Sequence, residues 1–223
     1  FSRDEAGSTQ GLYLAAKAGH NEESHNHNDV GSFLVYKNGH PAIIDIGSAT
    51  YTANYGNEWV RKSAYHNLAP IIDGKSQLKG RKYGARNVTY RNSGGEVVFA
   101  QDFAPAYDER ASLKSWHRTY THRKGESIVI ADRYEFDAEP AKVSLPMILN
   151  SPPNITEPGK VVISLAEGAS LAVTYDAEQF EYAIEEIAID DRKVSSRWGD
   201  DLYRLHFQMR QPARAGEFEF IIR

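Results

Sequence analysis

The feature that most constrains the fold is a series of short β-rich runs, separated by turn residues, along almost the whole chain of 223 residues. The clearest example joins residues 32–36 to residues 42–46 through Lys37-Asn38-Gly39. Because an Asn-Gly pair readily adopts the positive φ angles of a tight turn, this segment predicts a β-hairpin. Runs at such short spacing favour antiparallel pairing over a doubly wound α/β fold.

Further runs of the same kind bring the total to about a dozen strands. They cover residues 11–16, 88–90, 97–103, 113–122, 127–136, 141–149, 161–165, 170–175, 183–189, 202–209 and 217–222. Only residues 57–62 suggest a helical turn, and no 3.6-residue hydrophobic period persists elsewhere. We therefore expect an all-β fold, an antiparallel β-sandwich of two or more stacked sheets with little helix.

The ends and composition of the chain limit its partners. Residues 1–10 are polar and lack alternation, which predicts a linker from a preceding domain and a β domain over residues 11–223. There is no signal-peptide pattern and no stretch of 18 apolar residues, so we expect a fragment of a longer protein with no membrane partner. Formal net charge is −4 with both signs interspersed, which argues against nucleic acid as a partner.

The densest polar cluster is Gly19-His20-Asn21-Glu22-Glu23-Ser24-His25-Asn26-His27-Asn28-Asp29. In an extended backbone, His25 and His27 would project to the same face, and neutral imidazoles are good metal ligands. Asp45 follows a strand that should pair beside this cluster, and His66 is a further candidate ligand. Since the chain has no Cys, a metal would need His, Asp, Glu or carbonyl ligands. The same histidines would equally suit an ordinary surface loop.

Two metal motifs can be compared with this segment. A metallo-β-lactamase signature, HxHxDH, is excluded because Val30 stands where its last histidine would be. The first cupin motif fits Gly19, His25 and His27, but its glutamate and its second motif are missing. A cupin-like metalloenzyme therefore stays open as an alternative.

Several short motifs between residues 11 and 74 together resemble the signature of heparinase II/III-like polysaccharide lyases. They are Gly19-His20-Asn21, His25-Asn26-His27-Asn28-Asp29-Val30-Gly31-Ser32-Phe33, Gly39, Pro41, Ile44-Asp45-Ile46-Gly47, Tyr51-Thr52 and Ser63-Ala64-Tyr65-His66-Asn67. Ser115-Trp116-His117-Arg118, followed by Asp132, is similar to the next hairpin of that family. About the last hundred residues are similar only in their β-rich character.

The resemblance implies an architecture and a division of roles. Such enzymes join an N-terminal α/α toroid to a C-terminal β-sandwich, so residues 1–10 would be the linker from the toroid. His25 would be the catalytic histidine that the sandwich projects into the cleft. His27, Asp45 and His66 would bind one structural zinc ion. Nearby residues would contact substrate or support these groups: His20, Asn21, Asn26, Asn28, Asp29 and Trp59.

The family's chemistry is β-elimination of polysaccharides that contain uronic acid, such as heparan sulfate or alginate. The resemblance implies that the Tyr acid/base lies on the toroid, so that this fragment would be inactive alone, and that the enzyme is periplasmic or secreted in a bacterium. A non-catalytic glycan-binding sandwich stays open beside the lyase. A basic cluster, Lys79-Gly80-Arg81-Lys82 with Arg86, could meet a carboxylated or sulfated glycan, or it could be a solvated surface.

Overall fold

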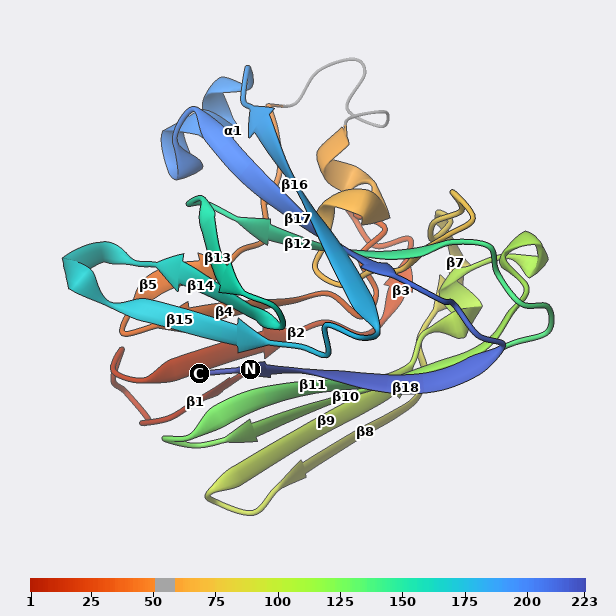
Figure 1. The fold of residues 1–223 in the computed structure, drawn as a ribbon, viewed down its shortest axis with the longest axis horizontal. Helices are drawn as coiled ribbons and strands as arrows, with labels where there is room; N and C mark the ends of the chain where they lie inside the picture. The colour runs from red at the N-terminus through yellow and green to blue at the C-terminus, as the bar shows by residue number, and fades with distance from the viewer. Residues whose placement is uncertain (51–58) are drawn as a thin grey trace.

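Antiparallel strands make up most of the regular structure in the computed structural model, which describes residues 1–50 and 59–223 (Figure 1). The largest sheet has eight strands. In spatial order they are β13 (Pro153–Glu157), β14 (Lys160–Ser164), β15 (Ser170–Thr174), β18 (Ala215–Ile222), β11 (Ser127–Phe136), β10 (Leu113–Arg123), β9 (Glu96–Asp102) and β8 (Arg86–Asn92). The expectation of an all-β sandwich is confirmed.

Three smaller sheets complete the described part of the chain. One contains β1 (Ser2–Arg3), β2 (Leu12–Ala16), β4 (Phe33–Lys37) and β5 (His40–Ile43). Another contains β16 (Phe180–Ala188), β17 (Asp201–Met209), β12 (Val143–Leu149) and β6 (Ile71–Ile72). The smallest pairs β3 (His20–Asn21) with β7 (Gly80–Gly84).

The predicted hairpin is present as β4 and β5. Lys37 pairs with His40 across a two-residue turn, in which Asn38 has φ 52° and Gly39 has φ 80°. Both angles are positive, as a turn with the right-handed twist of its strands requires. The turn brings β5 back alongside β4, and the segment after β5 carries Asp45.

Helix is scarce, and the sequence missed the longest helix in the described residues. This is α1 (Arg192–Trp198), whose N-cap Asp191 accepts hydrogen bonds from the backbone of Lys193 and Val194. Seven residues make only two turns, too few for a hydrophobic period to be visible. Of the helical turn expected at residues 57–62, the 3-10 helix η2 (Trp59–Arg61) is present, and residues 57 and 58 lie outside the described part, as do Tyr51 and Thr52.

The expected linker at residues 1–10 differs from the structure. Ser2 and Arg3 pair with Leu14 and Tyr13, so β1 is an edge strand of the sandwich. The Asp4 carboxylate accepts hydrogen bonds from the backbone of Leu12 and Gly125 and contacts buried His122 at 2.7 Å. The segment looked like a linker because backbone pairing and one carboxylate hold it, without a buried apolar face.

The main core lies where the large sheet packs on the two four-stranded sheets, around side chains such as Trp116, Tyr120 and Phe220. A second cluster of Ile44, Ile46, Val60, Val194 and Leu202 packs beneath the loops that carry the candidate site. Trp116 is fully buried and stacks on Tyr134 at 5.2 Å, so it is a packing residue and not a sugar-stacking one. Trp198 donates a hydrogen bond to the backbone of Ile46.

Candidate metal centre

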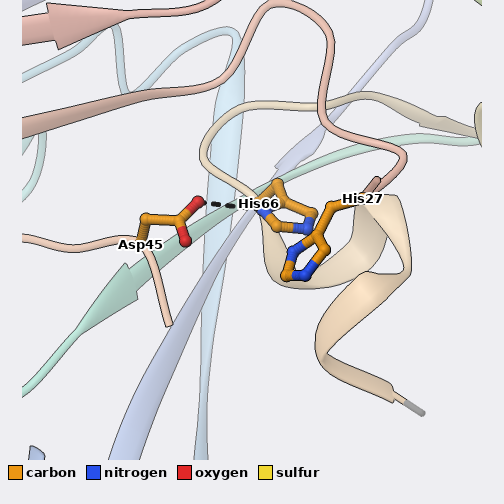
Figure 2. A group of neighbouring side chains, drawn as sticks. All are labelled: His27, Asp45 and His66. Carbon is orange, nitrogen blue, oxygen red and sulfur yellow. Dashed lines mark hydrogen bonds and ion pairs between the residues drawn. The ribbon is translucent and has the colours of Figure 1, made fainter. Parts of the chain in front are cut away.

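Three side chains that are far apart in the sequence meet at one point: His27, Asp45 and His66. Each offers one ligand atom, and these atoms lie within 4.8 Å of one another. His66 Nδ1 is 3.2 Å from Asp45 Oδ2, and the rings of His27 and His66 are 5.2 Å apart between centroids. In Figure 2, His66 stands between Asp45 on one side and His27 on the other.

Each of these residues comes from a loop at the end of a short element. His27 lies in the loop between β3 and β4, and Asp45 follows β5 by two residues. The backbone N–H of Gly47 donates to Asp45 Oδ1 at 2.8 Å and orients that carboxylate. His66 is the C-cap residue of the 3-10 helix η3 (Ser63–Tyr65), and its N–H donates to the carbonyl of Ser63.

Asn67, next to His66, links two of the loops. Its fully buried amide donates to the carbonyls of Phe33 and Ile44 at 2.6 and 2.8 Å. The amide oxygen accepts the N–H of Ile148 at 2.8 Å. One side chain therefore joins the backbone beside His66 to the backbone that precedes Asp45.

Arg118 joins the loop that contains His27 to the loop that contains His66. Its guanidinium donates to the carbonyls of Gly31 and Leu68, both at 2.8 Å. These carbonyls end the segments that carry His27 and His66. The guanidinium also forms a two-pronged ion pair with Asp132, and both side chains are fully buried. A planar guanidinium can make this set of bonds, whereas a lysine ammonium lacks the fork geometry.

The electrostatics of the three residues favour a cation among them. Burial lowers the pKa of His27 to about 4, with a further contribution from His66. Burial acts to raise the pKa of Asp45, but the hydrogen bonds from His66 and Gly47 and the charges of the neighbouring imidazoles together outweigh it and hold the pKa at about 2. For His66, burial acts to lower the pKa, but the hydrogen bond and charge of Asp45, together with the charge of Asp29, outweigh it and raise the pKa. Asp45 therefore stays ionised, and the imidazole of His27 stays neutral and can act as a ligand.

These residues fit a zinc ion in their donor chemistry. Two imidazole nitrogens and a carboxylate oxygen are a common zinc donor set, with a fourth tetrahedral position left for water. His66 is fully buried, and its Nε2 has no hydrogen-bond partner among the described residues. A buried imidazole nitrogen without a partner is costly, and a ligand in this cluster would relieve that cost.

His25 is not part of this cluster. It lies at the third position of a turn closed by the hydrogen bond from Asn26 N–H to the carbonyl of Glu23, and its φ is 59°. The expectation that His25 and His27 project to one face is wrong, because it assumed an extended backbone. The left-handed conformation at His25 separates the two side chains and leaves His25 exposed while His27 is half-buried.

The other candidate residues hold the histidine loop in place. Asn21 donates to Gln77 and to the carbonyl of Leu78, and Asn28 donates to the carbonyl of Gln77. Gln77 in turn bonds both the N–H and the carbonyl of Val30. The sequence did not single out Gln77, since a lone Gln in a polar stretch carries no pattern.

Charged and aromatic neighbours complete the support of this loop. Asp29 forms an ion pair with Lys17 at 2.6 Å. The carbonyl of Asn26 accepts from Arg61, and the ring of Trp59 packs edge-on against Tyr65 at 4.7 Å. The backbone of His20 pairs with Gly84, and its Nδ1 accepts from the N–H of Glu22. Lys17 and Arg61 were not predicted, because their partners are set by the tertiary fold.

The fold and the cluster define a class: an all-β domain whose loops gather histidine and carboxylate ligands at one edge. The family model for the heparinase II/III-like C-terminal domain matches residues 3–209. The chain belongs to this family. No curated protein sequence matches the chain.

Solved structures show the same fold. A heparinase III gene product superposes with a TM-score of 0.75 at 17% identity, covering 94% of this chain and 32% of that one. Heparan sulfate lyase HepC from Pedobacter heparinus gives 0.74 at 18% identity, covering 95% and 32%. A further heparinase III gives 0.68 at 16% identity, covering 96% and 35%. The chain thus spans about a third of the length of these proteins. Among residues 1–50 and 59–223, no helix is long and apolar enough to cross a membrane.

Proposed function

We propose that this chain is the C-terminal domain of a polysaccharide lyase that cleaves uronic-acid polysaccharides by β-elimination. The observation that carries the proposal is the family match over residues 3–209, together with an exposed histidine turn beside a cluster of metal-binding character. The similar solved structures include a heparan sulfate lyase, which supports an acidic polysaccharide as the substrate class.

In this proposal, His27, Asp45 and His66 hold one structural zinc ion. Zinc would supply the charge that fixes three loops to one another, because its ligands come from three separate segments. The buried position of His66 and the hydrogen bonds of Asn67 and Arg118 support an ordering role over a role in bond cleavage.

His25 is the residue of this chain that we assign to the cleft. β-Elimination removes the proton at C5 of the uronate, neutralises the carboxylate as negative charge develops, and protonates the leaving O4. An exposed imidazole can transfer a proton or neutralise that carboxylate near neutral pH. The turn at Glu23–Asn26 presents His25 outward, while His27 faces the cluster.

The proposal also assigns the remaining parts of the enzyme. An N-terminal α/α toroid of the same polypeptide would complete the cleft and supply the Tyr acid/base, so this chain alone would be inactive. A periplasmic or secreted location would bring the enzyme to its polymer. The coverage of only about a third of the similar structures supports a larger partner domain.

The test uses the complete lyase polypeptide with heparan sulfate and with alginate. We expect the absorbance of unsaturated uronate to appear with at least one polymer, and His25→Ala to lower kcat by about 100-fold, the scale of one general acid or base. Anomalous scattering should identify the bound ion as zinc, held by His27, Asp45 and His66.

Absence of product with every polyuronate would refute the lyase. Full activity of His25→Ala would favour a glycan-binding role, and a metal on His25 together with His27 would favour the cupin-like alternative.

A further inference from the structure

The basic cluster at residues 79–82 lies beside the histidine loop. β7, which contains Arg81 and Lys82, pairs with β3: His20 lies opposite Gly84, and Asn21 lies opposite Gly80. β3 leads directly into the turn that carries His25. Figure 1 shows β3 and β7 adjacent at one side of the molecule.

Close packing and one carboxylate hold β7 in this position. A Cβ on Gly84 would lie 2.5 Å from the carbonyl of Gly19, so glycine is required for the two backbones to approach. Glu22 Oε2 accepts the backbone N–H of Arg81 at 2.8 Å. The carboxylate of Glu22 is therefore engaged with the backbone of β7, while the side chains of Arg81 and Lys82 are exposed.

The cations of this segment differ in their partners from Arg86 and Arg91 on the neighbouring strand β8. Lys79, Arg81 and Lys82 are exposed, and none forms an ion pair with an acidic side chain within the described residues. Lys82 instead lies over the ring of Tyr83, with its Nζ 4.9 Å from the centroid. By contrast, Arg86 pairs with Asp102 at 2.8 Å, and Arg91 pairs with Glu96 at 3.0 Å.

Three exposed cations without an ion pair, Lys79, Arg81 and Lys82, therefore lie within four residues beside the histidine turn. We infer that Lys79, Arg81 and Lys82 form a subsite for the anionic groups, carboxylate or sulfate, of an acidic polysaccharide. Exposed cations of this kind attract and orient a polyanion and make binding sensitive to salt. This inference rests on the proposed function, because it places the subsite next to the cleft histidine.

The test compares two triple variants with the same loss of charge. One is Lys79→Gln/Arg81→Gln/Lys82→Gln. The control is Arg91→Gln/Arg123→Gln/Lys124→Gln. The control residues lie at the end of β8, β9 and β10 that is far from β7. There, Arg91 pairs with Val98, and Arg123 pairs with Glu96. Circular dichroism and thermal unfolding verify that both variants fold.

The measurement is the affinity of the 223-residue chain for heparan sulfate, alginate and uncharged dextran at several salt concentrations. We expect the β7 variant to bind the acidic polymers about tenfold more weakly, with a shallower salt dependence, and the control to change less than about twofold. Alginate carries carboxylates but no sulfates. Weaker binding of the β7 variant to both polymers therefore assigns carboxylate recognition, and weaker binding to heparan sulfate alone assigns sulfate recognition. Equal effects of the two variants, or no effect of the β7 variant, would overturn the inference.

The complete lyase separates this inference from the proposed function. In an active enzyme, the β7 variant should raise KM by a similar factor and leave kcat nearly unchanged, because the subsite binds substrate away from the reacting bond. An active enzyme whose KM does not change would refute the subsite alone. If the enzyme cleaves no polyuronate, the proposed function fails, and the binding comparison still decides whether β7 takes a polyanion.

Discussion

At the scale of single residues, the buried polar side chain of Asn67 fixes the backbone around the candidate metal site. Asn67 uses both amide hydrogens and its oxygen on three backbone groups. A buried carbonyl or N–H left without a partner costs about 1–3 kcal/mol. Removal of the Asn67 amide should therefore destabilise the fold and also change the spacing of Asp45 and His66.

We predict that Asn67→Ala lowers the free energy of unfolding by about 3 kcal/mol and weakens zinc binding by about 10- to 100-fold. Zinc affinity would be measured by competition with a chelating dye, well below the unfolding temperature. Gln101→Ala is the matched control, since its buried amide bonds the carbonyl of Lys17 and the hydroxyl of Tyr120 and makes no hydrogen bond to His27, Asp45 or His66. Wild-type zinc affinity in Asn67→Ala would show that Asn67 does not position the site.

At the scale of elements, β10 and β11 contribute the side chains that fix the loops of the candidate metal site. Trp116, Arg118, Tyr120 and His122 alternate inward along β10, so one strand contributes a guanidinium, an imidazole and two larger aromatic rings to the core. Both side chains of the Arg118–Asp132 pair are fully buried. The ion pair and the hydrogen bonds of Arg118 to two carbonyls therefore have to offset the cost of removing both charges from water. Breaking such a pair leaves one buried charge uncompensated.

Arg118→Met should therefore destabilise the chain by about 3–5 kcal/mol, because Asp132 is left buried without its partner. The double variant Arg118→Met/Asp132→Leu should recover part of this loss, because it leaves no unpaired charge. Urea denaturation of the two variants and the wild type gives the comparison. A single variant that loses less than about 1 kcal/mol would contradict the assignment of Arg118 as the support of both loops.

At the scale of the whole molecule, the N-terminal strand is joined to the large sheet by a titratable contact. His122 Nε2 is 2.7 Å from Asp4, and His122 Nδ1 is 2.8 Å from the Ser2 hydroxyl. Burial lowers the pKa of His122 despite the attraction of Asp4. Burial acts to raise the pKa of Asp4, but hydrogen bonds from Leu12, Gly125 and His122 outweigh it and lower that pKa.

Both shifts have the same sign for stability. A lowered pKa in the folded state means that protonation favours unfolding, so the stabilisation is present above the unfolded pKa and is lost as pH falls. We expect the free energy of unfolding to fall from about pH 6.5 downward as His122 titrates, by less than about 1.4 kcal/mol per pH unit for that proton, and further below about pH 4 with Asp4. In urea denaturation from pH 7.5 to 5.0, His122→Gln should flatten the upper part of this dependence. An unchanged slope would contradict the role of His122.

The sequence alone determined the antiparallel β class, the hairpin at Asn38-Gly39 and the set of three candidate ligands. Strand alternation and turn residues are local properties, and the three ligands lie in short motifs with fixed order. The strands β10, β11 and β17 were therefore placed to within a residue or two of their bounds in the structure. The same local rules missed α1, whose main signal is its N-cap residue. They also missed β1, which is held by backbone pairing and by polar contacts to residues far away in the sequence.

The family resemblance had already divided the histidine cluster, but only the tertiary structure gave the physical reason for that division. A period-two argument placed His25 and His27 together, and the positive φ at His25 separates them. Arg118, Asn67 and Gln77 act on loops that are up to 87 residues away in sequence, so no local pattern could connect them to the site. The pairing of β7 with β3, which brings an unpaired basic strand beside His25, is likewise a long-range contact. Long-range pairing depends on the packing of the whole sandwich, and this is why the sequence shows which residue types carry the chemistry but not which of them meet.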